Sequence, residues 1–276
     1  MFNQKHQIKV DYYHVNSDTI IGYKPMFPIL ESKAEYLWVS GDSRYHDFNE
    51  LDEKIFPYIK EGNVEYIVYN IGNNYCLPDT IYKDKGQMLH DTFVPSTCIG
   101  LSIYKTSIFD ILKKNTDLMQ KCDQLFKNNF GFGWLGYFYY AYNQENFTTL
   151  LANIKILPIL DKKKTQSWAV RFYGCWVDDL CQIIDNIPSS YTNKEQIPKN
   201  TWKVMALDSF NYGYLARKYG DLNKEKYKDM ITHGLINRIT DNPKKIKKFA
   251  TVPLCILEVV YLLFRVIRKI QRIIKK

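Results

Sequence analysis

Short runs rich in Val, Ile, Tyr and Trp alternate with helix-length stretches over the first two-thirds of the chain, and this alternation most constrains the fold. Strands that alternate with helices predict an α/β fold with a mostly parallel sheet flanked by helices. Apolar residues near helical spacing predict helices over Asn49–Lys60 and Ile108–Phe126. The runs with strand character are Ile8–Val15, Ala34–Ser40, Val64–Asn70, Ser96–Tyr104 and Ser167–Gly174.

The remaining body is predicted to be mainly helical. Asn128–Leu160 is dense in aromatic residues, and we expect a helix in its second half. Ile187–Tyr191, with its Pro-Ser-Ser sequence, has turn character. The pattern from Lys194 to Ile239 predicts a helical extension, which ends at the break Asp241–Pro243.

The net positive charge is confined to the C-terminal end. Of the net charge of +9, residues 244–276 supply all, with ten Lys and Arg and one Glu, while residues 1–243 balance 28 basic against 28 acidic side chains. A uniformly basic nucleic-acid binder does not have this distribution, so no nucleic-acid partner is predicted. The chain is predicted to be a neutral body with a cationic tail.

Val252–Lys276 has the pattern of one amphipathic helix. Its charged residues follow one stripe, and Leu, Ile, Val and Phe cover the other side. A membrane-spanning helix needs roughly 20 uninterrupted apolar residues, whereas Glu258 and Arg265 interrupt this run. The pattern therefore favours residues 244–276 lying on a membrane surface against anionic headgroups. A core helix or a dimer helix is the alternative.

Cysteines and the N-terminus bear on the compartment. The six cysteines form no Cys-x-x-Cys pair and the five histidines are scattered, so neither a structural zinc site nor a disulfide framework is predicted. The first ten residues lack the apolar stretch of a signal peptide. We expect a cytoplasmic protein, peripheral at the inner face of the cell membrane.

One segment carries the strongest chemical signal. The hydrophobic run Tyr36–Ser40 leads directly into Gly41-Asp42-Ser43-Arg44. Ligands of parallel sheets bind at the carboxyl ends of strands, where an Asp is placed to hold a metal or a ribose. Mg²⁺ and Mn²⁺ use one or two carboxylates together with substrate phosphates. A plain turn after the strand is the alternative.

This segment resembles the strand and acidic motif of GT-A-fold, family 2-like bacterial glycosyltransferases of the capsule and polysaccharide type. Asn49–Lys60 and Val64–Asn70 resemble the helix and strand that follow the motif. Thr97–Lys105 resembles the strand that lines the sugar-acceptor pocket, and Cys175–Tyr191 resembles a later helix and turn. The resemblance covers residues 1 to about 200 and implies a hexosyltransferase-like enzyme.

The resemblance also implies a donor site. It places the nucleotide-sugar against Gly41, Asp42, Ser43 and Arg44, with Asp42 on a divalent Mn or Mg ion. Arg44 stands where the family has a second Asp; a guanidinium pairs with a diphosphate and cannot bind a metal, so metal dependence is in question. The polar loop residues Asp18, Tyr23 and Lys24 are candidates for donor contacts, or form an ordinary loop.

The acceptor strand is carried over in the same way, and other candidates follow from side-chain chemistry and position in the sequence. Thr97 and Gly100 belong to the acceptor strand, and Trp134 and Tyr137 are candidates for stacking on a sugar, or else core residues. An inverting transferase needs a carboxylate base, for which Asp91 and Glu145 are the candidates; a surface position is the alternative for Asp91. The neighbours Asp178 and Asp179 are expected to point apart and to share no metal, one of them facing solvent.

The resemblance begins at the family's third strand, so the GT-A-like domain, residues 1–193, is expected to be N-terminally incomplete. A helical extension, 194–243, and the basic amphipathic helix, 244–276, follow it. The expected function is sugar transfer from a nucleotide-diphosphate donor to a lipid-linked or polysaccharide acceptor in cell-surface glycan synthesis. An inactive glycosyltransferase-like partner protein at the membrane surface is the alternative.

Overall fold

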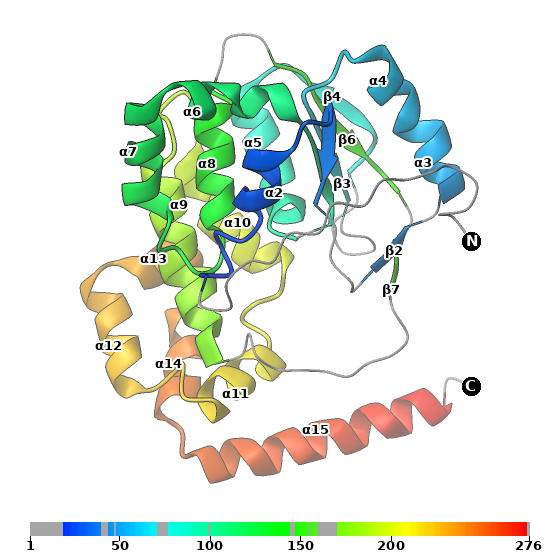
Figure 1. Cartoon of the computed structure of the whole chain (residues 1–276). Helices are drawn as coiled ribbons and strands as arrows, with labels where there is room; N and C mark the ends of the chain where they lie inside the picture. The colour runs from blue at the N-terminus through cyan, green and yellow to red at the C-terminus, as the bar shows by residue number, and fades with distance from the viewer. Residues whose placement is uncertain are drawn as a thin grey trace.

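The computed structural model describes residues 19–39, 44–46, 48–70, 77–98, 100–143, 147–154, 156–158 and 170–274. It is a mixed α/β fold in which one five-stranded sheet is wrapped by helices (Figure 1). The predicted strand Ile8–Val15 lies outside the described residues. In spatial order the strands are β1 (Tyr36–Trp38), β5 (Ser102–Lys105), β3 (Tyr66–Tyr69), β6 (Thr149–Ala152) and β4 (Thr80–Tyr82).

The sheet is not the mostly parallel one expected. Among the pairings described, only β3 and β6 run parallel, whereas β1–β5, β3–β5 and β4–β6 are antiparallel. The reason lies in the predicted strand Ser96–Tyr104, whose first residue instead ends helix α5 (Lys85–Ser96). The chain then turns at Gly100, and β5 enters the sheet between β1 and β3, antiparallel to both.

Helices cover both faces of the sheet, so that the central strand β3 alternates its side chains between two cores. Tyr66 and Val68 of β3 pack with α5, α2 (Met26–Glu31) and α8 (Gly133–Ala141). Ile67 and Tyr69 pack on the opposite side, against α3 (Phe48–Lys54). All four β3 residues are buried, as expected for a central strand.

Two predicted helices form with breaks. Asn49–Lys60 becomes α3 and α4 (Phe56–Glu61), and Ile108–Phe126 becomes η1 (Thr106–Phe109), α6 (Asp110–Lys114) and α7 (Thr116–Phe126). The break before α7 has a local cause, since the Asn115 side chain accepts a hydrogen bond from the amide of Leu118, 2.9 Å away, and caps the helix.

The aromatic segment after Asn128 also differs from the prediction. Its helix, α8, lies in the first half, and the second half contains β6 and β7 (Ile156–Pro158). β7 pairs antiparallel with β2 (Arg44–His46), so that Arg44 lies opposite Pro158. Arg44 therefore begins a strand of a second, two-stranded sheet.

The C-terminal region is helical, as predicted from Lys194 onward, and has its own core. This core begins earlier than the expected boundary, because Phe172 and Tyr173 pack against Trp202. The predicted strand Ser167–Gly174 is therefore wrong at its described residues, 170–174, which are helical. The elements are η3, a π-helix (Gly174–Asp179), α9 (Leu180–Asn186), η4 (Lys194–Gln196), α10 (Ile197–Val204), α11 (Phe210–Lys218), α12 (Lys224–Thr232), α13 (Leu235–Ile239) and α14 (Pro243–Thr251).

The chain ends in α15 (Leu254–Ile274), the long helix at the bottom of Figure 1. The predicted break at Asp241–Pro243 is confirmed between α13 and α14. By length and composition, no single helix of the described chain is able to cross a membrane; α14 and the first part of α15, Leu254–Ile267, pass that test only as a pair bent by 111°.

Candidate functional site

Four segments that are distant in sequence meet at the end of β1. Pro25, Val39, Gly100 and Trp134 line one small cavity there, together with Ser96 and Cys98 at the end of α5. The cavity holds about 10 Å³, so it is no ligand pocket by itself. The position of this cavity is more informative than its volume, because its lining residue Val39 is followed directly by Ser40–Arg44 in the sequence.

Gly100 is fixed by its backbone. Its φ of 96° lies in the left-handed region, which favours glycine. Its carbonyl oxygen accepts a hydrogen bond of 3.1 Å from the indole nitrogen of Trp38, on β1. Thr97, in contrast, caps the C-terminus of α5 and lies in no strand; its hydroxyl donates to the carbonyl of Val94 over 2.6 Å.

The loop expected to contact the donor packs against the start of α8. The amide of Trp134 donates to the carbonyl of Gly22 over 2.7 Å. The Tyr23 ring lies 5.6 Å from that of Tyr137 and beneath the ammonium of Lys127, 5.5 Å away. Burial, with Asp123 nearby, raises the pKa of Tyr23. Lys24 follows in the same turn and is partly exposed.

The two aromatic candidates on α8 differ in whether they line the cavity at the end of β1. Tyr137 is fully buried and its hydroxyl donates to Asp123 over 2.7 Å, so no part of its ring is left for a sugar. Burial and this bond raise its pKa far above the usual value. Trp134 is also buried, at 4% exposure, but it lines the cavity at the end of β1. Of the two, Trp134 is the one next to the site.

A buried carboxylate holds the loop before α8. Asp179 accepts a hydrogen bond of 2.9 Å from the amide of Gly131, and the Arg171 guanidinium lies 3.9 Å away. Burial, partly offset by these two donors, raises the pKa of Asp179 to about 6. Its neighbour Asp178 points elsewhere, to Lys226, and its side chain is 38% exposed. The expectation that the two carboxylates point apart, one toward solvent, is confirmed.

Asp91 lies on α5, away from the cavity at the end of β1. Its carboxylate accepts hydrogen bonds from the Tyr82 hydroxyl at 2.9 Å and the Gln87 amide at 2.7 Å. The other carboxylate oxygen lies 2.9 Å from Nδ1 of His90. The side chain is 17% exposed, so Asp91 is not the surface residue of the alternative interpretation.

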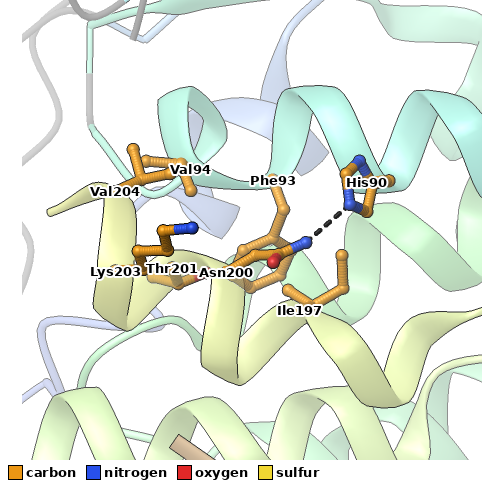
Figure 2. Close-up of a pocket in the computed structure, with 8 residues that line it drawn as sticks. All are labelled: His90, Phe93, Val94, Ile197, Asn200, Thr201, Lys203 and Val204. Carbon is orange, nitrogen blue, oxygen red and sulfur yellow. Dashed lines mark hydrogen bonds between the residues drawn. The ribbon is translucent and has the colours of Figure 1, made fainter. Parts of the chain in front are cut away.

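His90 lines a larger cavity of about 430 Å³ between α5 and α10 (Figure 2). Its Nε2 lies 2.5 Å from the amide nitrogen of Asn200, across the gap between the helices. An amide donor at Nε2 leaves Nδ1 to carry the proton toward Asp91, which fixes the tautomer. The remaining lining residues are Phe93, Val94, Ile197, Thr201, Lys203 and Val204.

An imidazole backed by a carboxylate is a common arrangement for a general base. Here Nε2 is occupied by Asn200, so His90 takes a substrate proton only if that amide moves aside. The sequence prediction missed His90 and Asn200, because the two residues lie 110 positions apart on separate helices. The only sequence signal was the adjacent pair His90-Asp91.

Several predicted site residues lie outside the described part of the chain: Asp18, Gly41, Asp42, Ser43 and Glu145. Within the described part, no group of three or more His, Cys, Asp or Glu side chains is placed to hold a metal ion. Because Asp42 is not described, a metal at that residue stays a prediction.

No protein-family model matches the chain, and no curated protein matches it.

Proposed function

We propose that this protein is a glycosyltransferase that moves a sugar from a nucleotide-diphosphate donor to a lipid-linked or polysaccharide acceptor. One observation carries the proposal. Pro25 adjoins the loop expected to contact the donor, Gly100 belongs to the segment that resembles the acceptor strand, and Trp134 is the aromatic candidate for stacking on a sugar. These residues lie around the end of β1, next to the residue that precedes Ser40–Arg44.

In this proposal the donor diphosphate binds at Gly41–Arg44. Gly41 allows close approach of the backbone, and Asp42 supplies the carboxylate for the ribose or for a divalent cation. Arg44 pairs with the diphosphate. Tyr23 and Lys24, in the loop that packs on α8, are the further candidates for contacts with the donor. A Mn or Mg ion bound through Asp42 would neutralise charge on the leaving diphosphate.

The acceptor lies toward Gly100 and Trp134. The base is less directly placed, because Asp91 contacts His90 and Tyr82 and does not line the cavity at the end of β1. We keep Asp91 as the base candidate acting through His90, with Glu145 as the other candidate. Binding of the donor alone needs no base. A titration with donor alone therefore tests Asp42 independently of Asp91 and Glu145.

The test is titration calorimetry of the full chain with UDP and UDP-sugars, with and without Mn²⁺. Asp42→Ala is expected to abolish donor binding and turnover, a loss of at least about 100-fold, since the carboxylate proposed to bind the donor is removed. Asp52→Ala is the matched control, because Asp52 is exposed on α3. Transfer that persists in the Asp42 variant at the wild-type rate would contradict the assignment.

The alternative, an inactive partner protein, predicts a different result. A folded wild-type chain that binds no nucleotide, with or without Mn²⁺, would favour that alternative over the enzyme. Binding without Mn²⁺ that Asp42→Ala removes would support a metal-independent donor site, with Arg44 in place of the second carboxylate.

A further inference from the structure

Helix α15 packs on the body with one side only. Leu257 is buried at 6% exposure, and the Tyr261 ring stacks on Tyr214 of α11 with centroids 4.2 Å apart. One turn on, Phe264 lies 6.1 Å from the ring of Phe210. The spacing of 257, 261 and 264 is that of a single helix face, so the inner side of α15 is accounted for.

The outer side is apolar and uncovered. Eight of the fifteen strongly exposed large apolar side chains of the described residues lie on α15. They recur at spacings of three and four, so they form one stripe on the side opposite Tyr261. A continuous exposed apolar stripe of this length marks an interaction surface, unlike single exposed residues. Its most exposed part includes Ile256, Val259, Leu263, Val266, Ile267 and Ile270, each at least 50% exposed.

The exposed lysines near this stripe favour an anionic lipid surface as its partner. On α14, Lys244, Lys247 and Lys248 are exposed, and they form no ion pair with any side chain in the described part of the chain. Because α14 meets α15 at a bend of 111°, its last turn, with Lys247 and Lys248, adjoins the start of α15. A second copy docked on the same stripe would bring two tails of +9 together. An anionic lipid surface matches both the stripe and the lysines.

We infer that α15 lies in the headgroup region of an anionic membrane, with its outer stripe against the acyl chains. The body then contacts α15 through Tyr214 and Tyr261. Helix α14 lies at a steep angle to the membrane surface, with Lys247 and Lys248 among the headgroups. This docking surface goes beyond sugar transfer, and it holds whether or not the chain is an enzyme.

The test is flotation of the full chain with vesicles of phosphatidylcholine alone or mixed with phosphatidylglycerol. We expect at least about tenfold tighter binding to the anionic vesicles, and weaker binding as salt is added. Leu263→Gln/Val266→Gln is expected to reduce this binding by at least about tenfold. Ile81→Gln/Ile231→Gln is the matched control, because these residues are 49% and 50% exposed outside the stripe.

The charge contribution has its own pair of variants. Lys247→Ala/Lys248→Ala is expected to weaken binding to anionic vesicles about tenfold. Lys224→Ala/Lys228→Ala, which removes the same charge from exposed positions on α12, is expected to leave it unchanged. Equal loss in both pairs would mean that only net charge acts, and would overturn the proposed orientation.

Sedimentation velocity without lipid tests whether a second copy of the chain, and not a membrane, covers the stripe on α15. A wild-type dimer that Leu263→Gln/Val266→Gln converts to a monomer, in a chain that binds neither kind of vesicle, would overturn the membrane proposal in favour of a second copy. Thermal unfolding of each variant, matching that of the wild type, shows that the substitutions at these exposed sites leave the fold intact.

Discussion

At the scale of single residues, Asp178 and Asp179 show how position on a helix decides the state of a carboxylate. Asp178 is partly exposed and pairs with Lys226, whereas Asp179 is nearly buried against Gly131. Burial favours the protonated form, so Asp179 has a pKa of about 6 in the folded chain against a usual value of 3.8. Arg171 and the Gly131 amide limit the rise.

This shift predicts a pH-dependent stability. Between the two pKa values the folded state holds more protons than the unfolded state, so the free energy of unfolding falls as pH rises from about 4 to about 6. Asp179→Asn removes this dependence. The stability of the variant relative to the wild type is expected to rise by up to about 3 kcal/mol between about pH 4 and about pH 7.

Urea unfolding across this pH range measures the effect. Asp52→Asn, at an exposed position on α3, is the control and is expected to keep the wild-type pH profile. Parallel profiles for Asp179→Asn and the wild type would show that burial of Asp179 does not control its protonation.

Gly22 packs so closely against the loop before α8 that no side chain fits at this position. A Cβ there would lie 2.2 Å from the carbonyl oxygen of Asn129, 2.7 Å from that of Phe130 and 2.9 Å from the amide of Gly133. All three are backbone atoms, which cannot rotate away. Gly22→Ala is therefore expected to lower the free energy of unfolding by about 1–3 kcal/mol.

Gly174→Ala is the matched control for Gly22→Ala, because the atoms nearest its Cβ would be those of the Arg171 side chain, at 3.4 Å or more. Chemical denaturation of both variants compares them, and only Gly22 also accepts the hydrogen bond that ties this loop to the Trp134 amide. Equal stability of the two variants would mean that the loop shifts at little cost.

At the scale of elements, sequence periodicity predicted the helices well where amphipathicity determines them. The region from Lys194 to Ile239 and the tail after Val252 are helical as expected, with the break where Pro243 begins α14. Periodicity failed where aromatic residues are buried on all sides. Phe172 and Tyr173 resemble strand residues in composition, but they are helical and fill the C-terminal core.

The candidate site could be predicted in part for the same reason. Gly100 was singled out by the resemblance of its local sequence and Trp134 by the chemistry of its aromatic ring, and the fold brings both to the end of β1. The contact between His90 and Asn200 depends on how α5 and α10 pack, which no local pattern encodes. Tyr137 is the opposite case. It was a candidate for stacking on a sugar, but its side chain is buried in the core.

At the scale of the whole molecule, the sequence predicted the class of fold but not the direction of its strands. Val, Ile and Tyr runs such as β3 and β5 predict strands buried on both faces, and both cores confirm this. Whether neighbours run parallel depends on where each connection returns. The turn at Gly100, which sends β5 back between β1 and β3, is a local feature of the connection and not of any strand.

This arrangement predicts an uneven distribution of stability, measurable by hydrogen exchange with mass spectrometry. Amides of β3 pair with β5 and β6 and are buried on both faces, so they are expected to exchange only on global unfolding. Amides in the second half of α15, where Val266 and Ile270 are exposed, are expected to exchange orders of magnitude faster. Anionic vesicles should then slow exchange in α15 and leave β3 unchanged, an effect that Leu263→Gln/Val266→Gln removes. Slowing spread evenly over the chain, or persisting in that variant, would mean that the molecule meets the membrane through some other surface.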